Sequence, residues 1–201
     1  MNSKTPLGSP ALPLRGARAG IAMTLGLGVA MAAAGARPYP ERAPLGHTGG
    51  FGEPTCMRCH AGDGINPPGG TLVLEGLPAA YEPARRYRLS MNLDRPGTRR
   101  AGFQLAIRFV GGEPSGLTAG RLRVLDERVQ LEDSAGVGYA FHTSAGSGLT
   151  APNRAVWALE WTAPGDGGRV VAHFVGNAAN DDASELGDLV YADSVVSEPA
   201  R

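Results

Sequence analysis

The stretch AGFQLAIRF, residues 101–109, decides the predicted fold, because its large apolar side chains recur at every second position. An extended chain points alternate side chains to opposite faces, so this spacing predicts a β-strand with one apolar face. The residues on that face are Phe103, Leu105, Ile107 and Phe109.

The same alternation continues on both sides of this stretch. Trp157, Leu159 and Trp161 share one face of another predicted strand. Thirty glycines and sixteen prolines supply turns between the runs, and no segment has the pattern of an amphipathic helix. The sequence therefore predicts an all-β domain, an antiparallel β-sandwich of about eight short strands. The expected strands are 71–75, 86–93, 101–109, 120–125, 129–131, 138–143, 155–161, 169–175 and 188–196.

A Cys-x-x-Cys-His motif precedes these strands, at Cys56, Cys59 and His60, and it contains the only two cysteines of the chain. This spacing lets two thiols form thioethers with the two vinyl groups of one haem, while the adjoining imidazole becomes the proximal iron ligand. The motif predicts one covalent haem c, with Cys56 and Cys59 as attachment points and His60 as the proximal ligand.

Other uses of a Cys-x-x-Cys pair fit the flanking sequence less well. A thioredoxin-type redox disulfide needs a strand before the pair and a helix after it, whereas both flanks, 49–54 and 61–70, are rich in glycine and proline. A structural zinc site normally needs four ligands, and the chain has no second cysteine pair. A disulfide across two residues would close only a very small loop.

The N-terminus has the features of an export signal. Residues 1–18 carry three basic and no acidic residues, 19–36 are uncharged, and Ala34-Gly35-Ala36 is a small-x-small cleavage pattern. We expect 1–36 to be a signal peptide, or an uncleaved membrane anchor, because 19–36 is at the lower limit for crossing a bilayer. The predicted location is periplasmic or extracellular, with anchoring through 19–36 as the alternative.

The rest of the chain divides into two predicted parts and shows no sign of nucleic-acid binding. Residues 37–54 are rich in proline and glycine and are predicted to be a linker, and 55–197 form the haem-binding sandwich. The formal net charge is zero and basic residues form only short pairs, which does not suit a nucleic-acid partner.

Several short segments resemble a bacterial family of secreted proteins, the choice-of-anchor V domain proteins, which are related to the Reeler domain (the Reelin N-terminal domain). The resemblance begins around the motif and covers approximately residues 45–197. It implies an immunoglobulin-like, Reeler-like β-sandwich and a location outside the cytoplasm. The matching segments, in order, are EPTCMRCH at 53–60, NPPGGTLVL at 66–74, GFQL at 102–105, HTSAG at 142–146, WALEWTAP at 157–164 and GNAAN at 176–180.

His142 is the predicted sixth, distal ligand of the iron. It ends a short predicted strand, next to a Gly- and Ser-rich loop from which an imidazole can face a haem. By alternation, Tyr139 and Phe141 fill the core and His142 points away from it. His142 also lies in the HTSAG segment of the resemblance.

The other candidate ligands fit less well. His47 lies in a Gly-rich stretch close to the motif and is an alternative, whereas His173 alternates with valines and is expected to pack in a strand. Met57 is tied too closely to the motif to reach the opposite side of the iron, and Met91 belongs to an apolar strand face. A calcium site is a further alternative for an acidic segment, which we instead expect to be a solvated loop. Its members are Asp181, Asp182, Glu185 and Asp188.

These features predict an exported monohaem c-type cytochrome that transfers single electrons to unidentified redox partner proteins and that is not an enzyme. Membrane association of these partners is an open alternative. Two alternatives stay open. One is an extracytoplasmic binding or structural module, or an accessory subunit of a membrane electron-transfer complex. The other is a five-coordinate haem sensor or enzyme, which needs acid–base groups on the distal side.

Overall fold

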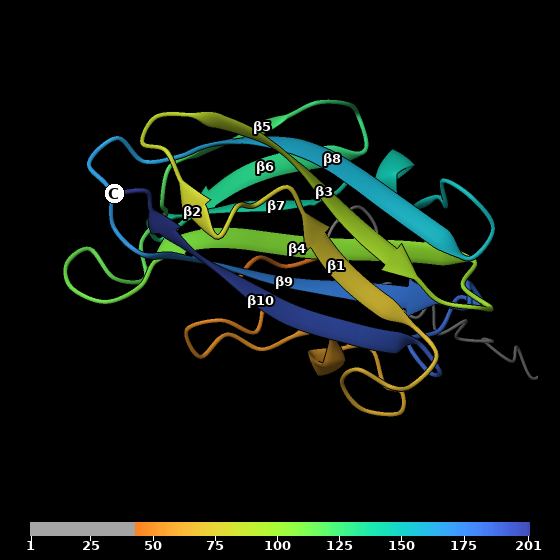
Figure 1. Ribbon diagram of the computed structural model, residues 1–201. Helices are drawn as coiled ribbons and strands as arrows, with labels where there is room; N and C mark the ends of the chain where they lie inside the picture. Colours follow the sequence, from red (N-terminus) through yellow and green to blue (C-terminus); the bar gives the residue numbers. More distant parts are fainter. Residues whose placement is uncertain (1–42) are drawn as a thin grey trace, which may run out of the picture. The chain divides into compact units, whose positions relative to one another are not determined.

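Two β-sheets packed against each other form the sandwich of residues 43–201, which are the residues described by the computed structural model (Figure 1). The predicted signal peptide or anchor, 1–36, lies outside the described residues. The four-stranded sheet has the order β1 (Thr71–Glu75), β3 (Arg86–Asp94), β8 (Arg154–Thr162) and β5 (Arg121–Val124). The six-stranded sheet has the order β2 (Ala80–Tyr81), β10 (Leu189–Pro199), β9 (Val170–Ala179), β4 (Arg100–Phe109), β7 (Val137–His142) and β6 (Val129–Ser134).

The predicted all-β antiparallel sandwich is confirmed. Every strand pair is antiparallel except the short contact between β10 and β2, which is parallel. The described part of the chain has ten strands rather than about eight. The strand that the sequence did not predict, β2, has only two residues, which is too short for any periodic signal.

The core lies between the two sheets and is filled by the side chains of the predicted apolar strand faces. Trp157, Leu159 and Trp161 of β8 are fully buried against Phe103 and Leu105 of β4 and their neighbours. The two indole N–H groups donate to backbone oxygens at 2.8 and 2.9 Å, so neither buried donor is left without an acceptor. Met91 is completely buried in the same cluster, as expected.

The alternation argument was wrong for β7. Tyr139 and Phe141 do not enter the main core; they form a second cluster with Ala106 and Val137 on the outer face of the six-stranded sheet. Ala140, of the opposite parity, belongs to the main core. The reason is that β7 is buried on both faces, so burial no longer follows alternation.

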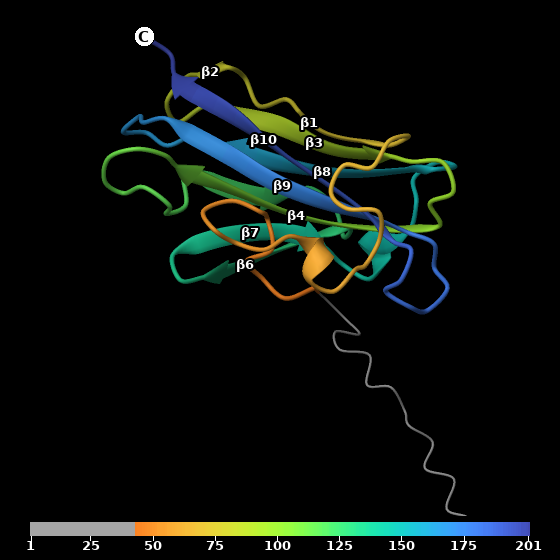
Figure 2. The same cartoon turned by 90° about the horizontal axis from the view of Figure 1, so that it is seen from below.

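Residues 43–54, which form the described part of the predicted linker, lie over the outer face of this sheet at β9, β4 and β7 (Figure 2). Two sets of hydrogen bonds fix them there. In the first, the backbone N–H of His47 donates to Gln104 at 2.7 Å, and Gln104 donates to the carbonyl of Pro44 at 3.0 Å. Gly50 lies so close to the ring of His173 that a Cβ at this position would be 2.3 Å from its Cγ.

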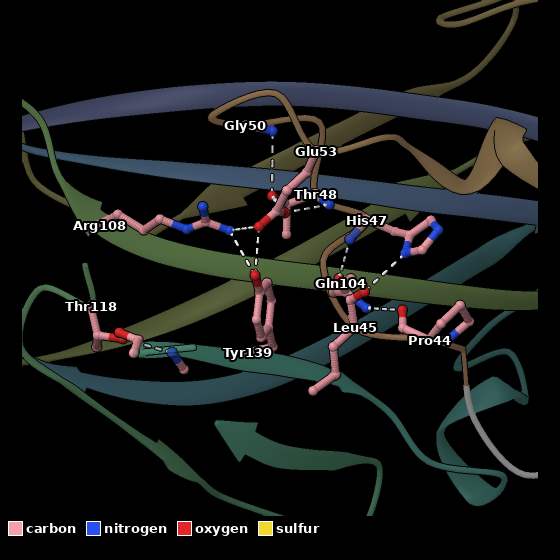
Figure 3. Close-up of polar contacts among 12 residues, drawn as sticks. Pro44, Leu45, His47, Thr48, Gly50, Glu53, Gln104, Arg108, Thr118 and Tyr139 are labelled. Carbon is pink, nitrogen blue, oxygen red and sulfur yellow. Dashed lines mark hydrogen bonds and ion pairs between the residues drawn. The ribbon is translucent and has the colours of Figure 1, made fainter. Parts of the chain in front are cut away.

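The second set is a buried ion pair between Glu53 and Arg108 (Figure 3). The Glu53 carboxylate also accepts from the Tyr139 hydroxyl at 2.5 Å and from the Thr48 hydroxyl at 2.6 Å. These bonds attach the segment immediately before the cysteine motif to β4 and β7. In the part of the chain that the structure describes, no helix is long and apolar enough to cross a membrane.

Candidate functional site

The Cys-x-x-Cys-His motif begins in a single turn of 3-10 helix, η1 (Cys56–Arg58). Thr55 starts this turn by accepting a hydrogen bond from the backbone of Met57 at 3.3 Å, and the backbone N–H of His60 donates to Cys56 at 2.9 Å. This turn brings both cysteines and His60 to one short piece of backbone.

The loop after the motif is fixed to the start of β10. The backbone N–H of Ala61 donates to Glu185 at 2.8 Å, and that of Asn66 donates to Val190 at 2.9 Å. Two isolated parallel bridges join the same pieces of chain. The motif therefore lies beside β9 and the loop that leads into β10.

All four residues predicted for the site line one cavity of about 270 Å³. They are Cys56, Cys59, His60 and His142, and His47 lies on the same wall. The volume is just below the usual range for ligand cavities, about 300–1,000 Å³. The cavity wall also includes Arg100, Gly102, Gln104 and Asn177.

His60 is oriented by a carboxylate that the sequence analysis did not connect with it. Its Nδ1 lies 2.7 Å from Oδ2 of Asp188, which is only 2% exposed. Asp188 also accepts from the side chain of Asn177 and the backbone of Asn180, both at 3.2 Å. An imidazole that donates Nδ1–H to a carboxylate keeps the Nε2 lone pair free for a metal ion.

The acidic segment therefore does not act as one group. Asp188 is buried beside His60, whereas Asp181, Asp182 and Glu185 are exposed, and Asp182 accepts hydrogen bonds from Ser184 within its own loop. Over residues 43–201, no group of three or more His, Cys, Asp or Glu side chains is arranged to hold a metal ion by itself.

His142 ends β7 with its ring against β4. The Phe103 N–H lies 3.1 Å from Nδ1, and the Phe103 carbonyl lies 3.3 Å from the same atom, so the tautomer decides which bond forms. Gly102 makes room for the ring, since a Cβ there would be 2.6 Å from Cε1. Burial lowers the pKa of His142 and the nearby charge of His60 lowers it further, while the Phe103 bond opposes both.

His47 has the hydrogen bonding that a metal ligand requires. Its Nδ1 lies 3.1 Å from the carbonyl of Leu45, an acceptor only, so Nδ1 carries the proton in this bond. Its Nε2 is buried and has no hydrogen-bond partner among the described residues. Two imidazoles besides His60 therefore face this cavity.

The remaining sequence candidates lie elsewhere. His173 does not line the cavity and packs edge-on against Phe51, with 5.5 Å between ring centroids. Burial, followed by repulsion from Arg108, lowers the pKa of His173. Met57 and Met91 are also absent from the cavity wall.

The two thiols differ in environment. Both cysteines are free, Cys59 is exposed, and Cys56 is partly covered. Burial raises the pKa of the Cys56 thiol to about 12, so this thiol is neutral at physiological pH.

The residues of the cavity fit a covalently attached haem. Its wall supplies two reduced thiols at the right spacing, one imidazole whose Nε2 is available, and further imidazoles for a second axial bond. Two buried polar atoms on this wall have no partner among the described residues: Nε2 of His47 and Oδ1 of Asn177. A buried polar atom of this kind calls for a partner such as a bound group or a water molecule, and six further buried polar atoms of residues 43–201, away from this cavity, share the property.

No protein-family model matches the chain, and no curated protein matches its sequence. Solved structures similar to it include two F-spondin Reeler domains. The Reelin-N domain of F-spondin has a TM-score of 0.46 and 16% identity over 73% of this chain and 96% of that one. The human F-spondin Reeler domain (fragment 1) has a TM-score of 0.43 and 19% identity, and the match covers 68% of this chain and 95% of that one. AvmM, which catalyses macrocyclization in alchivemycin A biosynthesis, has a TM-score of 0.43 and 11% identity over 71% and 95%.

Proposed function

We propose that this chain is an exported monohaem c-type cytochrome that carries single electrons between partner proteins. The observation that supports this most strongly is the convergence of Cys56, Cys59, His60 and a second imidazole on one cavity. The sequence motif accounts for the first three residues, but not for an imidazole that lies 82 positions later in the chain than His60 and faces the same cavity.

Each thiol would add across one vinyl group of the haem. The sulfur bonds to one vinyl carbon and the thiol hydrogen ends on the other, so attachment needs no oxidant and requires both thiols to be reduced. His60 would donate its Nε2 lone pair to the iron as the proximal ligand. When bound, a haem supplies the one-electron iron couple.

His142 is the proposed distal ligand, and His47 is the second candidate. His142 lies close enough to His60 for the two charges to repel, and Gly102 leaves space for its ring. Ligation through Nε2 requires its Nδ1–H to donate to the Phe103 carbonyl at 3.3 Å. His47 is favoured by a different observation, because its Nδ1–H is already bonded and its buried Nε2 has no partner among the described residues.

A six-coordinate, low-spin iron suits electron transfer, because the coordination shell closes the iron to small ligands and hardly changes with oxidation state. Two imidazole ligands should also give a lower reduction potential than one imidazole and a thioether, since imidazole stabilises the ferric state better. Arg100 lies on the cavity wall, where it is paired with Asp181 at 3.1 Å, and its guanidinium would suit the carboxylates of haem propionates.

The proposal also covers the family of this chain and its location in the cell. We place the chain with the choice-of-anchor V, Reeler-like secreted proteins, on the sequence segments that resemble them. Residues 1–36 would direct export to the periplasm or beyond, either as a cleaved signal peptide or as an anchor in the membrane. The redox partners would then also be extracytoplasmic.

Covalent attachment is tested by expressing the full chain in a bacterium with a cytochrome c maturation system and staining a denaturing gel for haem. The wild type should stain, and the Cys56→Ala/Cys59→Ala variant should not. Equal staining of both, or no staining of either, would refute the proposal. N-terminal sequencing of the exported protein distinguishes cleavage near Arg37 from a retained anchor.

Axial ligation is tested by optical and EPR spectra of the loaded protein and three histidine variants. His142→Ala should become high-spin and bind carbon monoxide in the ferrous form, whereas His173→Ala, the matched control away from the cavity, should stay low-spin. If His47→Ala changes instead, His47 is the ligand and the cytochrome proposal survives. If the wild type is already high-spin and binds carbon monoxide, the sensor or enzyme alternative is favoured over electron transfer.

A further inference from the structure

We propose that Asp188 is a positioning residue that fixes His60 in its Nδ1–H tautomer and gives the imidazole partial imidazolate character, which lowers the reduction potential of the bound iron. The tautomer can be tested without any cofactor. The effect on potential rests on the proposed function above.

The contact has the geometry of a strong, charge-assisted hydrogen bond. Nδ1 of His60 and Oδ2 of Asp188 are 2.7 Å apart, and they come from positions 128 residues apart in the chain. Asp188 is 2% exposed and His60 is 34% exposed, so the carboxylate is shielded from water while the imidazole reaches the cavity. Shielding strengthens such a bond, because no solvent competes for the carboxylate.

The other hydrogen-bond partners of Asp188 are neutral, so His60 is the group that its negative charge stabilises. The backbone N–H of Asn180 donates to Oδ1 and the amide of Asn177 donates to Oδ2, both at 3.2 Å. Both are neutral donors, and within the described residues the only ion pair of Asp188 is with His60. The Asn177 amide nitrogen lies 3.1 Å from Nδ1 of His60 and could donate to it in the other tautomer, but the contact of Nδ1 with the Asp188 carboxylate is much shorter, at 2.7 Å, and favours a proton on Nδ1.

A second histidine of the same cavity shows what is distinctive about this contact. His47 donates Nδ1–H to a neutral backbone carbonyl at 3.1 Å, whereas His60 donates to a carboxylate at 2.7 Å. A carboxylate pulls the Nδ1 proton more strongly and thereby raises electron density at Nε2. A more basic Nε2 stabilises ferric over ferrous iron, so the potential falls.

The first test uses the haem-free protein. Nitrogen-15 NMR of histidine-labelled protein should show His60 with a protonated Nδ1 and an unprotonated Nε2 at neutral pH. Asp188→Ala should remove this preference, while Asp182→Ala, which removes an exposed carboxylate of the same loop, should leave it unchanged. A protonated Nε2 in the wild type would overturn the proposal, even if every variant failed to fold.

The second test uses the haem-loaded protein and a potentiometric titration. Asp188→Asn keeps the shape of the side chain and removes its charge, and it should favour reduction at least tenfold, which corresponds to 59 mV for a one-electron couple. Asp182→Asn should shift the potential much less. Equal shifts in the two variants would show that Asp188 acts only as a nearby charge and would overturn the effect on His60.

The two proposals fail in different ways. A chain that takes up no haem refutes the proposed function, and with it the effect on potential, while the His60 tautomer still stands or falls by NMR. A chain that takes up haem with the wrong tautomer refutes only the role of Asp188.

Discussion

Replacing Glu53 with glutamine should be among the most destabilising single changes outside the main core. The Glu53 carboxylate is paired with Arg108, whose side chain is 4% exposed, and Glu53 itself is 14% exposed. It also accepts hydrogen bonds from Tyr139 and from both the hydroxyl and the backbone of Thr48. Glutamine keeps the size of the side chain but removes the charge, so the Arg108 guanidinium is left buried without a counter-charge.

The expected loss follows from that uncompensated charge. Removing one member of a buried ion pair typically costs about 3–5 kcal/mol, and a single hydrogen bond to a charged group contributes about 1.5–3 kcal/mol. We expect Glu53→Gln to lower the free energy of unfolding by about 3 kcal/mol, because the partly exposed Glu53 allows some water to compensate. Glu53→Gln/Arg108→Met should cost less than the sum of its single changes, since both charges leave together.

The loss should depend on pH with a definite sign. Burial alone would raise the pKa of Glu53, but the bonds from Thr48, Tyr139 and Arg108 outweigh it and hold the pKa below its ordinary value of 4.5. A lowered folded-state pKa means that the carboxylate contributes fully above pH 4.5 and loses its contribution as the pH falls through the folded value. The difference in the free energy of unfolding between wild type and Glu53→Gln should therefore become smaller at acid pH.

The assay is urea unfolding at neutral pH and again in acid, on proteins matched in haem content. The control is Asp94→Asn, which makes the same chemical change in the Asp94–Arg154 pair, where both side chains are over 40% exposed. An exposed pair contributes about 0–1 kcal/mol. If Glu53→Gln costs no more than Asp94→Asn at neutral pH, the argument from burial is wrong.

Two further predictions concern the cavity. Gly102→Ala should displace the His142 ring, because the new Cβ would lie 2.6 Å from Cε1, and should lower the free energy of unfolding by about 1–3 kcal/mol through overpacking. Unchanged His142 NMR signals and an unchanged unfolding midpoint would contradict this prediction. In haem-free protein at pH 8, iodoacetamide should modify Cys59 well before the partly covered Cys56, because burial raises the pKa of the Cys56 thiol to about 12 and leaves almost no thiolate. Peptide mapping over time measures the two rates, and equal rates would count against the raised pKa of Cys56.

The strands of the main core could be predicted from the sequence wherever one face is buried and the other is exposed. In β8, burial alternates strictly along the strand, so Trp157, Leu159 and Trp161 were assigned correctly to the core. In β7 the same rule failed for Tyr139 and Phe141, because a distant segment covers the outer face and buries both sides. Alternation reports a difference between two faces, and it carries no information where both are covered.

The cysteine motif is likewise a property of the sequence, because its chemistry depends on a fixed local spacing of Cys56, Cys59 and His60. What only the tertiary structure decided is which distant residues meet that motif. Asp188 looked like one member of a solvated acidic loop, and only the pairing of the loop after the motif with the start of β10 brings its carboxylate to His60. His142 and His47 reach the same cavity for a similar reason, since β7 and the 43–54 segment both pack against β4. Local spacing follows directly from the order of the residues. Contacts between residues far apart in the sequence depend instead on the order of strands in the sheet and on which loop covers which face.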